Sequence, residues 1–352
     1  HLSNPLLKVI DMKKSLIALA VMAASGAALA QSSVQVYGIV DAWVGSERDR
    51  WFDHDKNQSK LNEPRQTKLG SGGISASRFG FKGTEDLGGG LKANFLLEQG
   101  FDVDTGKPSS VSGEQFSRQA YVGFSGGFGE VKLGKIWTAY DDISGATNSA
   151  FDSKFSATAN VFVSGLLYDA NPNNGLYYAT PSFGGFSGAL SYALGEDKSN
   201  VKSASKVWAA HVKYEEGPIF AGLAYQREDD GVPGSSAIKF TRLNGSYDFG
   251  VAKALASYGR VTEGNDKTNE YHLGVDVPLG SNLVLSGGYA YSKTKVAGVV
   301  DSKRNGVGIA LGYNLSKRTM AYAGVNNSKE KDGAGQTIGK YNLYAVGVKH
   351  TF

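Results

Sequence analysis

The chain has 352 residues, with 37 basic and 33 acidic side chains and a formal net charge of +4. Cysteine is absent, which excludes a disulfide framework, thiolate catalysis and cysteine-based metal sites. Because the charges nearly balance, we expect no strong positive potential that would attract nucleic acid, and no nucleic-acid partner is predicted.

The first predicted elements concern export. Residues 1–11 precede the methionine at position 12 and fit no targeting pattern, so we interpret them as an upstream start-site artefact. A basic start at 12–14, an apolar stretch at 16–24 and an A-x-A motif at 28–30 predict a signal peptide over residues 12–30. The alternative, a helical membrane anchor, needs about 20 apolar residues. Cleavage would remove three lysines and one aspartate, leaving 34 basic and 32 acidic residues in 322 positions.

From residue 33 onward, apolar residues alternate with polar or small ones in short segments. Between residues 271 and 277, for example, Tyr271, Leu273 and Val275 alternate with His272 and Gly274. The same period of two occurs at 34–44, 78–84, 91–98 and 307–313. Such segments are predicted to be β-strands with one apolar face and one polar face.

The connections between these segments alternate strictly between short and long, with about seven short and eight long. This pattern predicts about 16 strands, and an even number with short periplasmic turns and long outer loops is typical of bacterial outer-membrane barrels. Frequent glycine and few prolines, 47 and 8 residues, agree with this class. The short connections are 85–90, 125–128, 182–185, 216–218, 249–250, 278–281 and 314–317. The long ones are 45–72, 102–115, 137–167, 195–205, 227–238, 261–268, 292–302 and 326–340.

The predicted fold is therefore all-β, a 16-stranded antiparallel transmembrane β-barrel formed by residues 31–352. An open sheet edge in hydrocarbon would leave backbone groups unpaired at several kcal/mol each, so the first strand must pair with the last, 341–352. Phe352, Val348, Val346 and Tyr344 share one apolar face of that last strand. A barrel of about 16 strands leaves an aqueous lumen rather than a packed interior.

One long connection, residues 137–167, interrupts the alternation for roughly thirty residues, and a loop of that length is uncommon unless it is functional. We expect it to fold into the mouth of the barrel as a constriction loop and to present Asp141, Asp142 and Asp152. Within a barrel, such a segment would limit what passes through the lumen.

Basic residues are predicted on the lumen side of two strands. Arg78 and Lys82 alternate with Phe79 and Phe81, and Arg118 lies on the polar face of the strand containing Tyr121. Rings of charged side chains in a narrow aqueous space set the ion preference of pores. Here the loop carboxylates would lie opposite the basic wall residues. A compatible alternative is that Arg78 and Arg118 pair with wall carboxylates such as Glu98 and only solvate the lumen.

Signals for catalysis are weak. The five histidines are scattered without H-E-x-x-H spacing, and no G-x-S-x-G motif is present. Residues 100–107 have the wrong spacing for a phosphate-binding loop. We therefore predict no catalytic residue, no cofactor and no metal site.

Several motifs carry a resemblance to a known family. SRFGFKGTEDLGGGLKANFLLEQGF at 77–101, FSRQAYVGFSGGFGEVKLGK at 116–135, YNLYAVGVKHTF at 341–352 and SSVQVYGIVDAWV at 32–44 resemble the general diffusion porins of Gram-negative outer membranes. The resemblance implies trimers of 16-stranded barrels in the outer membrane, with the third outer loop, here 137–167, folded inward. It also implies a row of basic wall residues beginning with Arg78 and Arg118, and a second outer loop, 102–115, that contacts a neighbouring subunit.

At one place the chain departs from that family. A third wall arginine often precedes the tyrosine of the following strand, where this chain has Tyr177. The expected function is a passive channel for ions and small hydrophilic solutes, with a weak preference for anions, in contact with outer-membrane lipid. Two alternatives remain open at this point. They are a substrate-specific channel with an aromatic track of Tyr37, Tyr140 and Tyr168, and a barrel hydrolase with a Ser/His/acid cluster at one rim.

Overall fold

The computed structural model describes residues 33–50, 52–53, 58–59, 64–110 and 113–352. The predicted artefact at residues 1–11 and the predicted signal peptide at 12–30 lie outside these residues. Within the described segments, no helix combines the length and the apolar character that crossing a membrane requires.

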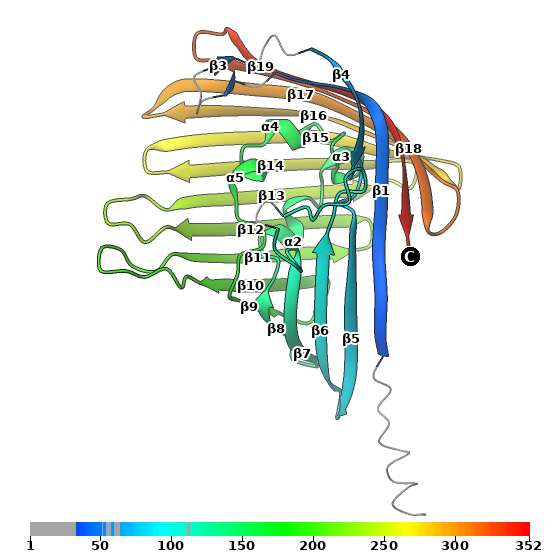
Figure 1. Cartoon of the computed structure of the whole chain (residues 1–352), viewed down its shortest axis with the longest axis vertical. Coiled ribbons are helices and arrows are strands. Elements are labelled where there is room, and N and C mark those ends of the chain that lie inside the picture. The colour runs from blue at the N-terminus through cyan, green and yellow to red at the C-terminus, as the bar shows by residue number, and fades with distance from the viewer. Residues whose placement is uncertain (1–32, 51, 54–57, 60–63, 111–112) are drawn as a thin grey trace, which may run out of the picture.

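Nearly all described strands belong to one antiparallel sheet that curves into a barrel (Figure 1). A separate small hairpin is formed by β2 (Phe52–Asp53) and β3 (Gln58–Ser59). The barrel strands are β1 (Ser33–Arg50), β4 (Gln66–Ser71), β5 (Arg78–Gly88), β6 (Leu91–Gly100), β7 (Gln119–Gly126), β8 (Gly129–Lys135), β9 (Gly175–Ala179), β10 (Phe186–Leu194), β11 (Lys206–Glu216), β12 (Ile219–Asp229), β13 (Ile238–Asp248), β14 (Lys253–Glu263), β15 (Asp266–Leu279), β16 (Leu283–Val296), β17 (Val299–Asn314), β18 (Thr319–Asp332) and β19 (Thr337–Thr351).

The sheet closes between the first and the last strand, as predicted. β1 pairs with β19 from Ile39↔Thr351 to Arg50↔Lys340. On its other edge, β1 pairs with β4 over residues 42–47 and with β5 over residues 33–39. The strands β4 and β5 therefore share one position in the barrel. The 17 strands of the sheet thus make 16 positions within the described part of the chain, which confirms the predicted count.

Residues 72–77 separate β4 from β5, and a buried carboxylate holds this break in place. Asp41 of β1 accepts hydrogen bonds from the backbone N–H groups of Gly73, Ile74 and Ser75 at 2.8–3.0 Å, and from the Tyr322 hydroxyl. The freed backbone donors are therefore satisfied although no neighbouring strand reaches them.

The apolar residues of the strands face outward. Among the predicted positions, Val34, Phe79, Leu273, Val307 and Phe352 are all exposed. In a bilayer this face meets lipid, so the exposure satisfies rather than violates the hydrophobic effect. The alternation read from the sequence assigned the faces of these strands correctly, but not those of β7, where Val122 and Phe124 are exposed and Tyr121 lies beside Lys132.

Three predicted long loops are mostly strand. The predicted loop 261–268 contains only a two-residue turn between Glu263 and Asp266. In the predicted loop 292–302, only residues 297–298 lie between β16 and β17. The interval 326–340 is likewise largely occupied by β18 and β19. These hairpins extend beyond the apolar band into water, where both faces are polar and the composition resembles that of a loop.

The predicted constriction loop lies within the interruption between β8 and β9, residues 136–174, called the inward loop below. It contains four short helical segments, α2 (Asp141–Ser144), α3 (Ser149–Asp152), α4 (Thr158–Val161) and α5 (Ser164–Leu167). Figure 1 shows them inside the barrel, between the front strands β5–β8 and the rear wall. α2 contacts β12 and β13, α5 contacts β14, and α3 and α4 contact strands from β15 to β18.

The buried apolar core lies between this loop and the wall. One cluster joins Ile136, Tyr140 and Ile143 of the loop to Ala209 and Phe240 of the strands. A second cluster surrounds Phe155 and includes Ala150, Tyr322 and Leu343. These clusters place the loop against the wall from β9 through β19 to Trp43 of β1, and they leave β5 and β6 facing the loop.

Candidate functional site

The basic wall residues meet at one carboxylate. Arg118 Nε donates to Glu98 Oε1 at 2.8 Å, and Arg78 Nε lies 3.4 Å from Glu98 Oε2. The Tyr37 hydroxyl donates to the same Oε2 at 2.9 Å. We call Arg78, Arg118 and Glu98 the wall triad. Its formal charge is +1, because one carboxylate serves two guanidinium groups.

Two aromatic rings hold the wall cations in place. The Arg118 guanidinium lies 5.1 Å from the ring centroid of Trp137, at the start of the inward loop. The Lys82 ammonium lies 4.9 Å from the ring of Tyr37. Lys82 is four residues from Arg78 toward the short-turn end, and it lines a separate cavity of about 270 Å³. The structure therefore does not bring Lys82 together with the loop carboxylates.

A further wall cation, Lys132, escaped the sequence analysis. It pairs in register with Tyr177, and its ammonium lies 4.8 Å from the Tyr177 ring and 5.2 Å from that of Tyr121. It also contacts Glu130 at 2.9 Å. Lys132 thus supplies a positive charge beside the place where the resemblance implied an arginine. Its position two residues after Glu130 on one face of a strand was the signal that could have revealed it.

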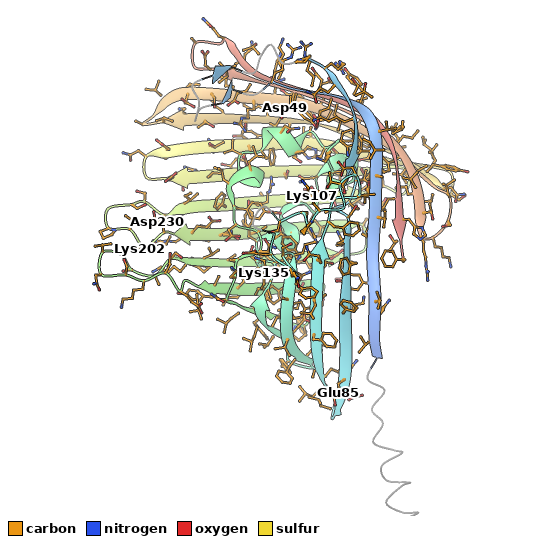
Figure 2. The ribbon with its side chains drawn as sticks, in the orientation of Figure 1. Asp49, Glu85, Lys107, Lys135, Lys202 and Asp230 are labelled. Atoms are coloured by element: carbon orange, nitrogen blue, oxygen red, sulfur yellow. The ribbon has the colours of Figure 1, made fainter. Side chains whose placement is uncertain are left out.

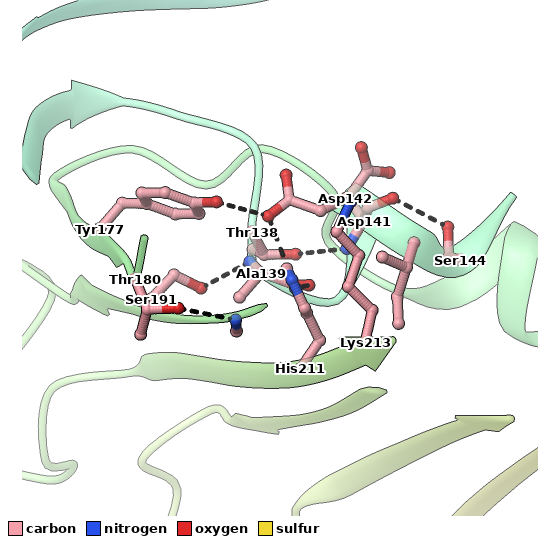
Figure 3. A network of polar contacts seen from close by, with 12 residues as sticks. Thr138, Ala139, Asp141, Asp142, Ser144, Tyr177, Thr180, Ser191, His211 and Lys213 are labelled. Carbon is pink, nitrogen blue, oxygen red and sulfur yellow. Dashed lines mark hydrogen bonds and ion pairs between the residues drawn. The ribbon is translucent and has the colours of Figure 1, made fainter. Parts of the chain in front are cut away.

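Two predicted loop carboxylates lie side by side at α2. The Tyr168 hydroxyl donates to Asp141 Oδ1 at 2.5 Å, and the Tyr177 hydroxyl donates to Asp142 Oδ2 at 2.6 Å. His211 Nδ1 lies 3.6 Å from the same Oδ2 and 2.7 Å from the carbonyl oxygen of Ala139 (Figure 3). The two tyrosines orient these carboxylates, because each hydroxyl fixes one carboxylate oxygen, and His211 is held beside Asp142 by its hydrogen bond to Ala139.

The third predicted carboxylate, Asp152, lies in an unusual turn. Ala150, Phe151 and Asp152 have φ angles of 53°, 64° and 48°, so three consecutive residues other than glycine are left-handed. Each such residue costs about 1–2 kcal/mol. The turn is held by a 2.6 Å hydrogen bond from the Ala150 N–H to Ser286 Oγ and by Asn148, whose Nδ2 donates to Asp152 Oδ1 at 2.7 Å.

The three carboxylates border one cavity of about 590 Å³. Lys154 and Arg242 also line it, and the buried Arg242 guanidinium lies 4.4 Å from the ring of Phe162. The sequence analysis missed both cations. Lys154 lies in an irregular loop, and Arg242 belongs to a strand whose lumen side is covered by that loop.

Buried hydrogen bonds attach the inward loop along its whole length to the wall. These contacts satisfy polar groups that the loop takes out of water, so they specify its position. They are Thr138 Oγ1 to Gln226 Oε1 at 2.7 Å, Thr147 Oγ1 to Asn244 Oδ1 at 3.0 Å, Ser164 N–H to Glu270 Oε1 at 2.8 Å, and Asn326 Nδ2 to the Ser156 carbonyl oxygen at 2.7 Å.

Glycine on the inner wall permits this close packing. A Cβ built on Gly308 of β17 would collide with the carbonyl oxygen of Phe155, and one on Gly288 of β16 would collide with Ser149 Oγ. At Gly308 the loop backbone therefore lies directly on the strand backbone, and at Gly288 the Ser149 side chain lies directly on it.

The aromatic track considered for a substrate-specific channel does not form. Tyr140 is fully buried, and its ring packs against those of Tyr168 and Phe240 at centroid distances of 5.1 and 6.1 Å. Tyr37 instead donates its hydroxyl hydrogen bond to Glu98 of the wall triad. The three tyrosines therefore do not line a common path.

Burial raises the pKa of Asp141 to about 6, although the Tyr168 hydroxyl and Arg118 act in the opposite direction. Burial also raises the pKa of Asp142 and of Asp152. A carboxylate with a raised pKa loses its charge earlier as the pH falls. The negative charge of the site should therefore weaken as the pH falls, beginning near pH 6 with Asp141.

We expect the preference for anions over cations to rise a few-fold between pH 7.5 and pH 5. As the pH falls through about 6, Asp141 becomes neutral and the constriction loses negative charge. The variant Asp141→Asn removes this titrating group from the constriction. The reversal potential should depend less on pH in that variant than in the wild type. An equal pH dependence in both proteins would show that Asp141 is not the group responsible.

Comparisons with known proteins agree with this geometry. A family profile described as Gram-negative porin matches residues 16–333. Outer membrane porin protein 32 of Delftia acidovorans is 38% identical over 357 residues, covering 96% of this chain and 95% of that protein. The major outer membrane protein P.IB of Neisseria lactamica is 29% identical and covers 97% and 100% of the two chains.

Solved structures give the same result. The anion-selective porin from Comamonas acidovorans superposes with a TM-score of 0.75 at 29% identity, over 91% of this chain and all of that one. OmpT of Vibrio cholerae, solved in a trimer form, matches with a TM-score of 0.69 at 17% identity, over 91% and 99%, which shows the fold alone. With the family match and the closed barrel, these relatives place the protein in the outer membrane. The chain belongs to the Gram-negative porin family, whose barrels form water-filled channels for ions and small hydrophilic solutes.

Proposed function

We propose that this channel has a weak preference for anions and that its charged lumen groups set the preference. The observation that carries the proposal is the wall triad, in which Arg78 and Arg118 share the single carboxylate of Glu98. One positive charge is left over, and Lys132 stands close by on the same wall. The low-dielectric walls of a narrow lumen increase the effect of such charges on passing ions.

In this proposal the six predicted residues act as two opposed groups. Arg78 and Arg118 attract anions on the wall, and Lys82 does so nearer the short-turn end. Asp141, Asp142 and Asp152 border the loop-side cavity and oppose this field. Burial raises the pKa of all three carboxyl groups, that of Asp141 to about 6, so their opposition to the wall cations weakens as the pH falls.

We infer that passage involves no chemical step. A serine and a histidine do approach each other, since Ser149 Oγ lies 2.9 Å from His272 Nε2. Both residues are buried beneath the loop, and within the described chain His272 Nδ1 has no hydrogen-bond partner. A hydrolase needs a solvent-accessible nucleophile and an orienting acid, so this pair favours a structural function over catalysis.

We also infer that the protein acts as a homotrimer after removal of residues 12–30 as a signal peptide. The trimer agrees with the family resemblance of residues 77–101 and 116–135. The apolar outer face, which includes Val36, Phe81 and Leu91, supplies the surface that lipid and neighbouring subunits would share.

Solute flux into liposomes tests the proposal. Glucose, gluconate and glucosamine have nearly the same size but differ in charge, so their relative rates isolate the field from sieving. We expect gluconate to enter fastest and glucosamine slowest at pH 7.5. Glucosamine entering faster than gluconate would overturn the anion preference, and flux equal to that of empty liposomes for all three would overturn the channel itself.

A further inference from the structure

The inward loop curls around a cavity whose base is formed by Arg242 of the barrel wall. This cavity has a volume of about 590 Å³ and is called the loop cup below. Among the described residues that line it, Arg242 belongs to β13 and all others belong to residues 141–168 of the inward loop. Small-molecule sites usually have volumes of about 300–1,000 Å³, so the cup is large enough for a small solute.

Arg242 differs from its neighbours on the inner face of β13, which attach the loop. Phe240 packs against the ring of Tyr140 at a centroid distance of 6.1 Å, and Asn244 Nδ2 donates to the Ile143 carbonyl oxygen at 2.5 Å. Arg242 is only 3% exposed, yet within the described chain its Nε and Nη1 have no hydrogen-bond partner. Buried polar groups are normally paired, and an unpaired buried guanidinium is costly. Two donors are therefore left for a ligand that enters the cup.

The ring of Phe162 supports the guanidinium group of Arg242. The guanidinium carbon lies 4.4 Å from the ring centroid, and Phe162, itself only 1% exposed, also lines the cup. A guanidinium that contacts an aromatic face keeps the N–H groups at its edges free for hydrogen bonds. Because its planar fork matches the two oxygens of a carboxylate, a carboxylate is the ligand group that fits this base best.

The carboxylates near Arg242 do not neutralise it by direct contact. Both oxygens of the buried Glu270 are occupied by Ser164, whose N–H and hydroxyl donate to them at 2.8 and 2.5 Å. Asp152 borders the cup, yet among the described residues it forms no ion pair within 4 Å. Burial raises the pKa of Asp152 and the charge of Arg242 acts in the opposite direction. The two opposite charges therefore influence each other across one cavity without touching.

The carboxylates Asp141 and Asp152 at the rim of the cup each keep one oxygen available for a positive group. Asp152 Oδ1 accepts from Asn148 and Asp141 Oδ1 from Tyr168, and no donor of the described residues is bonded to either Oδ2. In the part of the chain that the structure describes, no three acidic or histidine side chains are placed to hold a metal ion. An ammonium group has three N–H donors and suits these separate oxygens, whereas the carboxylates would repel a phosphate dianion.

The loop cup opens into the lumen. Ala146 and Gly165 border the cup and are exposed. Figure 1 shows α2 to α5 inside the barrel, and Figure 2 shows Lys202 and Asp230 at the tips of two long loops, far from Glu85 at the short β5–β6 turn. A solute that crosses between these two ends of the barrel therefore passes the open rim of the cup.

We propose that the loop cup binds neutral α-amino acids as zwitterions while they cross the channel. The amino acid carboxylate accepts hydrogen bonds from Arg242, and the α-ammonium group donates to Asp152. One carbon atom separates the two charges of an α-amino acid, so a single molecule can bridge charges that the protein keeps apart. A simple anion or cation of the same size would satisfy only one of them. This proposal adds a solute class to the proposed function, and it rests on the open channel but not on the anion preference.

The test measures how strongly three related solutes reduce the single-channel current in a planar bilayer at pH 7.5. L-Leucine carries both charges, 3-methylbutylamine is leucine without its carboxylate, and 4-methylpentanoate is leucine without its ammonium group. Arg242→Gln removes the charge at the base of the cup, and Asp152→Asn removes the charge at its rim. Lys213→Gln is the matched control, because Lys213 also lies inside the barrel, pairs with Glu215 at 3.0 Å and is not among the described residues that line the cup.

We expect leucine to block the wild-type current at a concentration roughly 10- to 100-fold lower than either analogue, since each analogue loses one hydrogen-bonded charge pair. Arg242→Gln and Asp152→Asn should each weaken the leucine block by the same factor, and Lys213→Gln should change it by about twofold or less. The double variant Arg78→Gln/Arg118→Gln should change the reversal potential and leave the leucine block intact. That variant separates a failure of this proposal from a failure of the anion preference.

An equal leucine block in the wild type and in Arg242→Gln would overturn the proposal, as would a block by 4-methylpentanoate as strong as that by leucine. Arg242→Lys keeps the buried charge but loses the planar fork, and it should be blocked more strongly than Arg242→Gln and more weakly than the wild type. Should neither Arg242 variant fold, Asp152→Asn decides alone, because it keeps the shape of the side chain. A leucine block of wild-type strength in Asp152→Asn would exclude the zwitterion site.

Discussion

Replacing Arg78 and Arg118 together by glutamine is expected to turn the weak anion preference into a cation preference. Glu98 lies between them with a side chain only 6% exposed, and the Tyr37 hydroxyl keeps donating to it. The wall triad then changes from a charge of +1 to −1. A unit charge about 4 Å from a passing ion is worth about 1 kcal/mol even in water, so a change of two units alters the energy of that ion by about 2 kcal/mol, or roughly thirtyfold in its occupancy.

Two further variants make this a graded series. Glu98→Gln alone gives the triad a charge of +2 and should strengthen the anion preference. The triple variant Arg78→Gln/Arg118→Gln/Glu98→Gln is neutral and should be nearly non-selective. Reversal potentials under a salt gradient at pH 7.5 measure all of them, and high salt should compress the differences by screening. Reversal potentials that do not follow the order +2, +1, 0, −1 would exclude the wall triad as the origin of selectivity.

Phe155→Ala is expected to have the second large effect, by weakening the attachment of the inward loop. The Phe155 side chain is fully buried, with its ring 5.9 Å from that of Tyr322 and directly over Gly324. Truncating a buried phenylalanine typically costs about 3–5 kcal/mol. The left-handed turn at residues 150–152 stores strain only while its surroundings hold it, so the loop should begin to leave the wall.

The expected readout is an open-channel current with added fluctuations and sub-levels, together with a lower temperature of unfolding. Phe183→Ala is the matched control, because Phe183 is 87% exposed in a short turn and touches no part of the inward loop core. A quiet channel of normal conductance in Phe155→Ala would show that this residue does not hold the loop against the wall.

Most of the barrel could be predicted because its physics is local. A strand crossing the apolar band must alternate with a period of two, and the segments at 271–277 and 307–313 do so without exception. The outer hairpins do not show this alternation, because water surrounds both of their faces. Lys293 and Lys303 therefore resemble loop residues in the sequence, although they are paired strand residues in the structure.

The site was predictable where charge lay on a strand and less so elsewhere. Arg78 follows from parity, whereas Arg118 precedes β7 and shares the parity of Val122 and Phe124, which are exposed on the outward face. Glu98 was one expected partner of the two arginines, but that both share it depends on a register between three strands.

The inward loop has no periodic pattern from which its structure could be predicted. Nothing in the residues Ala150 and Phe151 announces a left-handed turn, since glycine or asparagine is the usual signal for one.

The most direct test of the account is the reversal potential of the unmodified protein in a planar bilayer between two concentrations of potassium chloride at pH 7.5. Since the two ions have nearly equal mobility in water, the sign reports the field of the pore. We predict a modest potential on the chloride side, with current appearing in groups of three equal steps. A potential on the potassium side would contradict a net positive constriction, and a folded protein without conductance would contradict the open lumen.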